Sequence, residues 1–589
     1  MTENSEFPRR HIGPNGKDVS DMLEALNLPS LDALIDLAVP TNIRELSEPL
    51  TLPEALEEAE ALRRLKEIAE KNEVKTSLIG LGYYDNFTPS VIQRNILENP
   101  AWYTAYTPYQ PEISQGRLEA LINYQTLVSE LTGCELSNAS LLDEPTAVAE
   151  AMALLHRVQK SSKNTFLLDW DTLPQTKAVV ATRAEAMGID VVIGDPDDAP
   201  EDCFAVLYQY PGASGQVRNL ASAIKNHQTN GVLTAVAADL LALTILTPPG
   251  ELGVDVVVGS SQRFGVPMGF GGPHAGYISL KAEYKRSLPG RLVGASIDIH
   301  GEQAFRLALQ TREQHIRREK ATSNICTAQV LLAIIAGMYG VYHGPEGLKN
   351  IAQKTHSLMN EFVGTLKASG YEVLTENWFD TVTIKTTDNA SFFVDKALER
   401  GINIRYVDAD HVAVSFDETT DRHIVSNLLG AFTDTDLLTD IPSSLPKNVL
   451  RTSDFCKQSV FSLYRSETEM LRYIRRLSDK DLALDRTMIP LGSCTMKLNA
   501  SSEMIPISWE EFANIHPFVP SAQRRGYDQL ISELEDWLVK ITGYSAVSLQ
   551  PNAGSQGEFA GLLAIRAYHL ANGQTERTIC LIPASAHGT

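Results

Sequence analysis

The stretch between residues 204 and 258 decides the fold. It reads FAVLY at 204–208, LASAIKNH at 220–227, VLTAV at 232–236 and VVV at 256–258. The first, third and fourth of these segments are short and apolar, which favours buried strands, whereas the second favours a helix. Apolar strands that alternate with helices predict an α/β fold with a mostly parallel sheet covered by helices on both faces.

The same alternation continues on both sides of this stretch. Further strands are expected at 166–168, 191–193 and 276–280, and further helices at 53–72, 148–158, 173–187 and between Gly116 and Gly133. A helical stretch at 327–369 leads to a smaller unit with strands at 381–384 and 412–414. A large doubly wound domain followed by a long helix and a small α/β domain is the layout of fold-type I pyridoxal-phosphate enzymes, although many functions share such folds.

Composition and charge describe an acidic globular chain. Its 589 residues include 51 basic and 73 acidic side chains, for a net charge of −22, and 43% are hydrophobic. The acidic excess argues against nucleic-acid binding, because nothing offsets phosphate repulsion. No apolar run is long enough to span a membrane and the N-terminus has no apolar signal core, so we expect a cytoplasmic protein without a membrane partner. The six scattered cysteines form no CxxC pair, so no metal site is expected.

The chain begins to repeat itself after a linker expected at 433–450. An offset of 410 residues aligns Gly116 with Gly526 and Gly133 with Gly543, and each interval encloses a helix of equal length. Two unrelated helices that happen to stop at glycines would give the same spacing. We favour a tandem duplication whose second copy is incomplete. The expected boundaries are an N-terminal segment at 1–50, a first-copy large domain at 51–345, a small α/β domain at 346–432, and the start of a second copy at 451–589.

The expected second copy contains a candidate anion-binding segment. Residues 549–558 (LQPNAGSQGE) run from an apolar strand through a glycine turn into a helix. Backbone amides at such a helix start are unpaired and favour an anion, and Ser555 and Gln556 beside Gly554 add side-chain donors to a phosphate. A helix start without any ligand is the alternative reading. No GxxxxGK[ST] motif is present, so a nucleotide-binding P-loop is not supported.

Three other segments are candidates for the site. His587 follows an expected strand at 578–583, where a histidine either stacks on a planar ring or is merely solvated. The glycines of the segment 258–273 either permit a close approach of the backbone or simply form a long turn between strands. The stretch 102–111 is rich in aromatic, hydroxyl and proline residues, and its side chains line a pocket, form an interface or simply pack.

Several long motifs resemble one family. They include RHIGP at 10–14, YTPYQPEISQG at 106–116, the segment 258–273, REKATSNICT at 318–327 and PLGSCTMKLN at 490–499. These resemble the pyridoxal-phosphate-dependent P-protein of the glycine cleavage system (glycine decarboxylase), in the type with two fused homologous halves. The resemblance extends over essentially the whole chain.

The resemblance implies a cofactor, a reaction and partners. The enzyme class is glycine dehydrogenase (aminomethyl-transferring), with pyridoxal 5'-phosphate as cofactor. It decarboxylates glycine, releases carbon dioxide and passes the aminomethyl group to the lipoyl arm of the H-protein. The T- and L-proteins of the same system are indirect partners, and a homodimer is expected for the intact protein.

The resemblance also assigns residues. Gly554, Ser555 and Gln556 correspond to the phosphate cradle of the catalytic second half, and His587 to the residue that stacks on the pyridine ring. Gln262 occupies the place of the catalytic lysine in a degenerate first half. Because glutamine cannot bind the cofactor covalently, none is expected to be held so there.

The family's active site lies between the halves, so Tyr106, Thr107 and Tyr109 are expected to line the substrate pocket. In the family, the catalytic lysine and the aspartate that pairs with the pyridine nitrogen lie beyond the position of Thr589. We therefore expect a chain truncated in its second half, without a catalytic residue of its own and inactive alone. The alternative is a non-catalytic binding subunit that dimerises or pairs with a separate catalytic chain.

Overall fold

The structure is a computed structural model that describes residues 6–11, 13–44, 50–104, 108–310, 329–435, 438–488 and 500–584. It forms two compact units. The first comprises Met1–Val74, Asn499–Phe512 and Pro520–Gln550, and the second comprises Lys75–Leu498, Ala513–Val519 and Pro551–Thr589.

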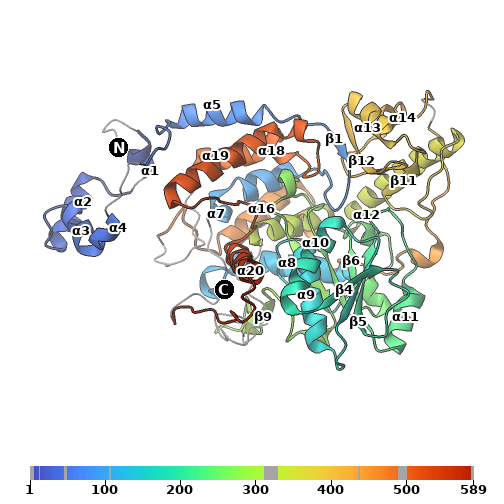
Figure 1. Ribbon diagram of the computed structural model, residues 1–589, viewed down its shortest axis with the longest axis horizontal. Coiled ribbons are helices and arrows are strands. Elements are labelled where there is room, and N and C mark those ends of the chain that lie inside the picture. Colours follow the sequence, from blue (N-terminus) through green and yellow to red (C-terminus); the bar gives the residue numbers. More distant parts are fainter. Residues whose placement is uncertain are drawn as a thin grey trace. The chain divides into compact units, whose positions relative to one another are not determined.

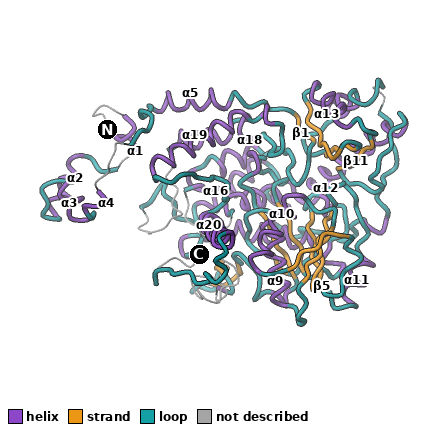
Figure 2. Tube along the Cα trace, viewed as in Figure 1, coloured by secondary structure: helices purple, strands orange, loops and turns teal. Residues whose placement is uncertain are grey.

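The second unit is built on a seven-stranded sheet. Its strand order is β2 (Leu136–Ser137), β8 (Gly276–Leu280), β7 (Val256–Ser260), β6 (Leu233–Ala238), β5 (Cys203–Tyr210), β3 (Thr165–Asp169) and β4 (Asp190–Gly194). The five strands from β7 to β4 run parallel, whereas β8 is antiparallel to both β7 and β2. Figure 2 shows these strands as one orange group. The predicted mostly parallel, doubly wound sheet is confirmed.

Helices cover both faces of this sheet because its strands are apolar on both sides. On one side Val206 and Tyr208 of β5 belong to a core shared with α8 and α12, and on the other side Ala205 and Leu207 join a core formed with α9 and α10. Alternate residues of a strand point to opposite faces, so a continuously apolar strand needs two cores. The bounds of the helices are α8 (Gln115–Thr132), α9 (Glu144–Val158), α10 (Pro174–Met187), α11 (Ala221–Thr229) and α12 (Val330–Ala368). Figure 1 shows α9, α10 and α11 beside the sheet.

A smaller sheet follows the long helix α12. Its order is β1 (Thr76–Leu78), β12 (Ile402–Asp408), β13 (His411–Ser415) and β11 (Thr381–Lys385), and α13 (Ala390–Glu399) and α14 (Arg422–Leu429) belong to the same region. A separate core of this region takes residues from the end of α12 and from β11, β12 and β13. The predicted small α/β region is therefore present.

The first unit is mainly helical. It contains α2 (Gly16–Ala25), α3 (Leu31–Ala38), α4 (Thr41–Arg44), α5 (Glu58–Ala69), α17 (Ser501–Met504), α18 (Glu510–Ala513, whose last residue belongs to the second unit) and α19 (Arg525–Thr542). Helix α5 packs on α19, and Asn72 joins them because its Oδ1 accepts a hydrogen bond from the Tyr527 backbone amide at 3.1 Å. An ion pair of 2.9 Å between Arg64 and Glu533 adds to this contact.

The remaining α-helices and strands belong to neither of the two larger sheets. They are α1 (Glu6–His11), α6 (Ser90–Ile92), α7 (Pro100–Tyr103), the hairpin of β9 (Val293–Ile297) and β10 (Gln303–Leu307), α15 (Val460–Leu463), α16 (Glu467–Ser478) and α20 (Gly554–Ala571). Among the described residues, no helix combines the length and apolar character that crossing a bilayer requires.

The prediction of two strands, one before Gln550 and one at 578–583, is wrong. The apolar residues before Gln550 and those at 578–583 are irregular, and the side chains of Ile579 and Leu581 are 87% and 92% exposed. A strand needs a neighbour to pair its backbone amides and carbonyls, and the described residues supply none for either segment. The helix expected next to them did form, as α20.

Candidate functional site

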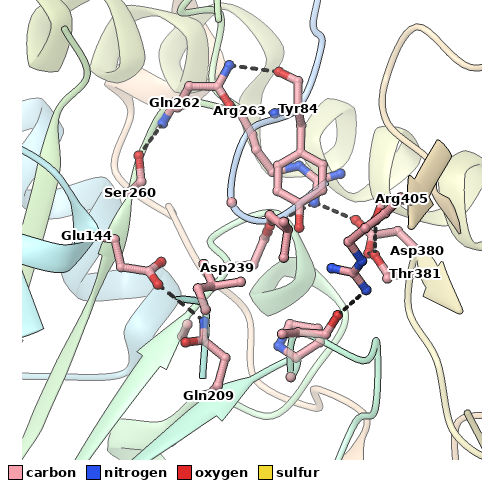
Figure 3. A pocket seen from close by; sticks show the side chains of 18 residues that line it. Tyr84, Glu144, Gln209, Asp239, Ser260, Gln262, Arg263, Asp380, Thr381 and Arg405 are labelled. Atoms are coloured by element: carbon pink, nitrogen blue, oxygen red, sulfur yellow. Dashed lines mark hydrogen bonds and ion pairs between the residues drawn. The ribbon is translucent and has the colours of Figure 1, made fainter. Parts of the chain in front are cut away.

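A small polar cavity lies where the carboxyl ends of the parallel strands meet. Gln209 near the end of β5, Asp239 after β6 and Ser260 at the end of β7 line it, and Arg405 of β12 closes it from the smaller sheet. Its volume is about 40 Å³. In open α/β sheets this edge is the usual place for ligands. Figure 3 shows the labelled side chains converging on one space.

Gln262, the expected lysine position, is at this cavity and is fully engaged in hydrogen bonds. Its Nε2 donates to the carbonyls of Tyr84 at 2.7 Å and Val266 at 2.8 Å, and its Oε1 accepts from the Tyr84 amide at 3.0 Å. Only 1% of the residue is exposed. The side chain thus holds the loop around Tyr84 against the turn after β7. Among the described residues that line the cavity there is no lysine.

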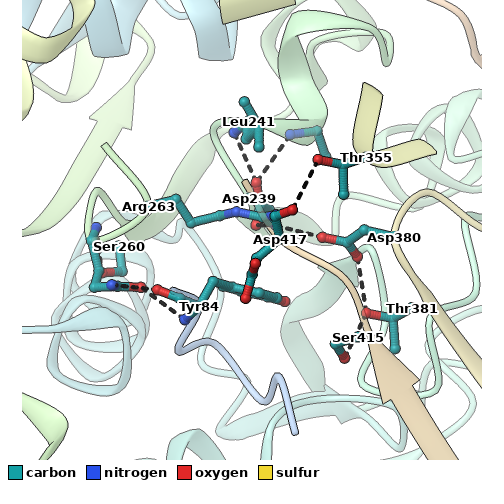
Figure 4. Close-up of polar contacts among 12 residues, drawn as sticks. Tyr84, Asp239, Leu241, Ser260, Arg263, Thr355, Asp380, Thr381, Ser415 and Asp417 are labelled. Atoms are coloured by element: carbon teal, nitrogen blue, oxygen red, sulfur yellow. Dashed lines mark hydrogen bonds and ion pairs between the residues drawn. The ribbon is translucent and has the colours of Figure 1, made fainter. Parts of the chain in front are cut away.

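The next residue, Arg263, centres a buried ionic network that sequence reasoning missed. Its Nη1 is 2.7 Å from Asp239 Oδ2 and 2.5 Å from Asp380 Oδ2, and its guanidinium lies 3.9 Å from the centre of the Tyr84 ring. Burial raises the pKa of Asp380 to about 6, although Arg263 opposes the shift. Figure 4 shows Arg263 reaching across to Asp380. We interpret this cation between two carboxylates as a structural network, because each charge is partly balanced by the opposite charge beside it.

Helix α9 begins at the same cavity and carries its own negative charges. Asp143 caps the helix by accepting a hydrogen bond from the Thr146 amide at 2.8 Å. Glu144, the first helical residue, is 9% exposed, and burial raises its pKa to about 7. Unpaired amides at a helix start favour an anion, and here the chain supplies carboxylates of its own.

Helix α20 begins in the opposite way. The residue before it, Ala553, gives no side-chain cap, and the first turn contains no acidic residue. Gly554, Ser555 and Gln556, the expected phosphate cradle, lie together in that turn, and the last two are half-buried. The start of α20 therefore keeps its free amides and adds a hydroxyl and an amide side chain beside them.

The other expected site residues fall into two groups. Tyr106, Thr107 and His587 lie outside the described residues. Tyr109 is described and does not line the cavity. Its hydroxyl accepts a hydrogen bond of 3.1 Å from Arg291, whose guanidinium lies 4.7 Å from the centre of the ring.

The segment at 515–516 packs on the loops around Gly80 and Phe270, a contact that sequence reasoning also missed. His516 is 1% exposed, and its Nε2 is 2.9 Å from the Gly80 carbonyl oxygen. The Ile515 carbonyl accepts a hydrogen bond from the Phe270 amide at 2.8 Å. The ring of Tyr83 lies edge-on to that of His516 at 5.7 Å. The proline-rich pattern HPFVP at 516–520, similar to TPYQP at 107–111, is the signal that could have identified this contact.

One helix-crossing geometry occurs twice in the structure. In the second unit, a Cβ on Gly116 would overlap the Leu477 carbonyl, and Asp481 accepts hydrogen bonds from the Gly116 and Arg117 amides. In the first unit, a Cβ on Gly526 would overlap the Ile68 carbonyl, and Asn72 accepts from the Tyr527 amide. An isolated antiparallel bridge accompanies each crossing, Ser114 with Asp481 and Arg524 with Asn72.

The sequence pattern of the glycine cleavage system P-protein matches residues 9–432. The chain belongs to this family. The P-protein family resemblance is therefore confirmed, and with it the fold-type I class of the large and small α/β regions.

Three relatives of the P-protein family describe the extent of the match. The glycine dehydrogenase (decarboxylating) of Agrobacterium fabrum is 56% identical over 585 residues, which are 99% of this chain and 61% of that protein. That of Rhodopseudomonas palustris is 55% identical over 595 residues, 99% of this chain and 60% of that protein. A crystal structure of glycine decarboxylase (P-protein) of the glycine cleavage system in inhibitor-bound form superposes with a TM-score of 0.65 at 33% identity, covering 71% of this chain and 98% of that one. The chain thus spans about three-fifths of the length of these curated relatives.

Proposed function

We propose that this chain is part of a glycine decarboxylase that uses pyridoxal phosphate. The assembled enzyme releases carbon dioxide from glycine and passes the aminomethyl group to the lipoyl arm of the H-protein, whose disulfide takes up the electrons. Pyridoxal phosphate, when bound, supplies an electron sink for the pair left by the departing carboxylate. A homodimer, a cytoplasmic location and indirect partnership with the T- and L-proteins belong to the same proposal.

The observation that carries the proposal is the contrast between the starts of α9 and α20. The two helices begin 410 residues apart, at Glu144 and Gly554. A phosphate at the start of α9 would meet the buried Glu144 and the capping Asp143, so like charges would oppose it. At the start of α20 it would meet free amides, Ser555 and Gln556, and no acid from the helix itself. Asp143 also reaches this helix start, because its Oδ2 accepts a hydrogen bond from Asn552 Nδ2 at 2.8 Å.

The first-copy cavity does not fit the cofactor in other respects. Its volume is about 40 Å³, whereas sites for ligands of cofactor size usually measure about 300–1,000 Å³. Gln262 stands in the expected lysine position and is held by three hydrogen bonds. We therefore assign the cofactor to the second copy alone, and we give the first copy a structural part in the assembled site.

The repeated helix crossing supports the tandem duplication. Gly116 and Gly526 are separated by 410 residues, and their partners Asp481 and Asn72 by 409. In each case the helix before one copy crosses the glycine of the other copy. We propose that this reciprocal exchange ties two copies into one enzyme.

The same reciprocity supports the expected pocket walls. The segment with His516 packs on the first-copy loop at 80–83. The matching first-copy segment, with Tyr106, Thr107 and Tyr109, would then pack on the second-copy site by the same exchange. In that place the three side chains would orient the substrate and exclude water, and His587 would stack on the cofactor ring. A drier site favours loss of charge from a carboxylate.

Reconstitution tests the proposal. The chain would be mixed with the part of the Agrobacterium fabrum relative that lies outside the matched region, with pyridoxal phosphate and lipoylated H-protein, and exchange of labelled bicarbonate into glycine would be measured. Exchange should require both polypeptides. No exchange from a folded complex would contradict the proposed activity, and full exchange without the chain would contradict its part in it.

A variant tests the phosphate cradle within the same assay. Ser555→Asp places at α20 the kind of charge that α9 carries, and it should raise the cofactor concentration for half-maximal exchange by about 10- to 100-fold. Thr575→Asp adds the same charge in an exposed turn after α20 and should leave that concentration unchanged. Equal effects of the two variants would exclude the cradle assignment.

A further inference from the structure

The first-copy cavity contains buried polar atoms without a protein partner. Within the described part of the chain, Arg263 Nη2, Arg405 Nε and Gln209 Oε1 make no hydrogen bond. All three residues line the cavity, and Arg263 and Gln209 are 7% and 5% exposed. Leaving a buried donor or acceptor unsatisfied costs about 1–3 kcal/mol, so three such atoms around one space indicate a polar occupant.

The unsatisfied atoms require opposite features of that occupant. The two guanidinium groups offer N–H donors and therefore need an acceptor, which a carboxylate provides in the best geometry. Gln209 Oε1 is an acceptor and needs a donor. An occupant that satisfies all three atoms has an anionic acceptor at one end and an N–H donor at the other.

The charged side chains around the cavity disfavour both a simple anion and a simple cation as its occupant. Glu144, Asp239 and Asp380 face Arg263 and Arg405 around the space. A simple anion would meet the three carboxylates, and a simple cation would leave the guanidinium donors without an acceptor. In the view of Figure 3, Glu144 and Arg405 lie on opposite sides, with Asp239 between them.

The charges of Glu144 and Arg405, on opposite sides of the cavity, are poorly balanced by other groups of the protein. Burial raises the pKa of Glu144 to about 7, and burial lowers the pKa of Arg405, with only Tyr84 and Asp171 opposing that shift. Each shift is towards the neutral form, as expected for a buried charge that lacks a close partner. An ammonium group near Glu144 and a carboxylate near Arg405 would restore both charges.

Size restricts the occupant further. A water molecule needs about 10–15 Å³ of such space, so 40 Å³ holds about three waters or one molecule of about five non-hydrogen atoms. The smallest α-amino acid has this size and both required ends. Leu81, Ala213 and Arg405 line both the cavity and an adjoining groove of about 620 Å³, which gives a route of entry past Arg405.

We propose that the first-copy cavity binds a small zwitterionic amino acid of glycine size, non-covalently and without cofactor. Its carboxylate contacts Arg263 and Arg405, and its ammonium group contacts Gln209 and Glu144. No residue of α20 lines this cavity, and the proposal does not depend on the proposed catalytic function.

A ligand series on the unaltered chain tests the site. Binding would be measured by isothermal titration and saturation-transfer NMR, with no pyridoxal phosphate present. Glycine should bind saturably, whereas acetate, methylammonium and valine should bind at least 10-fold more weakly, because each lacks one charged end or exceeds the space. Equal binding of acetate and glycine would replace the zwitterion by a simple anion, and no saturable binding of glycine would leave a water-filled cavity. Either result overturns the proposal.

Variants locate the site. Arg405→Met should weaken glycine binding at least 10-fold, and Arg405→Lys should restore part of it if the variant keeps the charge in place. Lys177→Met is the matched control, because Lys177 lines only the adjoining groove. Ser555→Asp should leave glycine binding unchanged, which separates this site from the proposed cofactor cradle. Unchanged binding in a folded Arg405→Met variant would place the ligand elsewhere.

Discussion

Glu144 gives the sharpest test of the electrostatics at the start of α9. Its carboxyl is buried, and burial raises its pKa from the ordinary value of 4.5 to about 7. Glu144→Gln removes the ionisable group and keeps an oxygen that accepts from Gln209 Nε2, now at 3.4 Å, and from Thr176 Oγ1, now at 3.5 Å. The variant therefore changes charge with little change in shape.

The sign of the effect follows from proton linkage. An acid whose pKa is raised by folding holds its proton more tightly in the folded state. Its contribution to stability is therefore complete below pH 4.5 and is lost as the pH rises to about 7. The gap of about 2.5 pH units, at about 1.4 kcal/mol per unit, corresponds to about 3 kcal/mol. Glutamine does not ionise, so it has no such loss. The free energy of unfolding of the variant should therefore rise relative to that of the wild type as the pH rises.

Urea unfolding of the wild type and the variant at pH 5 and pH 8 measures this difference. Circular dichroism and tryptophan fluorescence would follow unfolding, and the difference in unfolding free energy should move by about 2–3 kcal/mol in favour of Glu144→Gln. Glu185→Gln, at an exposed position on α10, controls for removal of a carboxylate as such. A difference that stays constant between the two pH values would refute the reasoning, because it would mean that Glu144 ionises in the folded protein as it does in water.

Three further predictions concern the helix crossings and the lysine position. Asp481→Ala should cost about 3–5 kcal/mol in urea unfolding, because the guanidinium of Arg117, 2% exposed, loses its buried ion-pair partner. Gly526→Ala should cost about 1–3 kcal/mol or more, because the new methyl group meets the Ile68 carbonyl, and limited proteolysis should show a loosened first unit. Gln262→Lys should lower stability by about 1–3 kcal/mol and should gain no absorbance from covalently held pyridoxal phosphate, since the carboxylates at α9 remain.

Much of the fold between residues 76 and 429 could be predicted from the sequence because its signals are local. The expected strand at 204–208 became β5, and the helix between Gly116 and Gly133 became α8. That helix ends where Gly133 adopts a φ of 71°, a conformation that glycine adopts without strain. Hydrophobic periodicity and glycines at helix ends are therefore the signals that predict most of these helices and strands.

The two strands that the sequence wrongly predicted have a common physical origin. The segments before Gln550 and at 578–583 have strand composition, yet composition describes how a chain fits a sheet that already exists. Without neighbours among the described residues they stay irregular and exposed. The helix α20 formed in the same region because its backbone hydrogen bonds are internal.

The site was less accessible to sequence reasoning than the fold. Gln262 could be placed because it belongs to a recognisable segment. The ionic network of Arg263 with Asp239 and Asp380 joins residues up to 141 positions apart in the sequence, counted from Asp239 to Asp380, so only the folded chain brings them together. His516 was missed for the same reason, since its partner Gly80 lies 436 positions away in the sequence.

The starts of α9 and α20 differ in the charges that their own residues supply. A phosphate site needs free amides and no acid in the same turn, and the first turn of α20 meets both conditions, although Asn552 just before it donates a hydrogen bond to Asp143 at 2.8 Å. In α9 the cap Asp143 satisfies an amide that a ligand would otherwise occupy, and the cost of burying Glu144 falls on stability instead. A helix start that binds no phosphate can carry such a cap, whereas a helix start that binds phosphate cannot. The two acids at α9 therefore add an electrostatic argument, independent of Gln262 in the expected lysine position, to the proposal that the cofactor binds at α20.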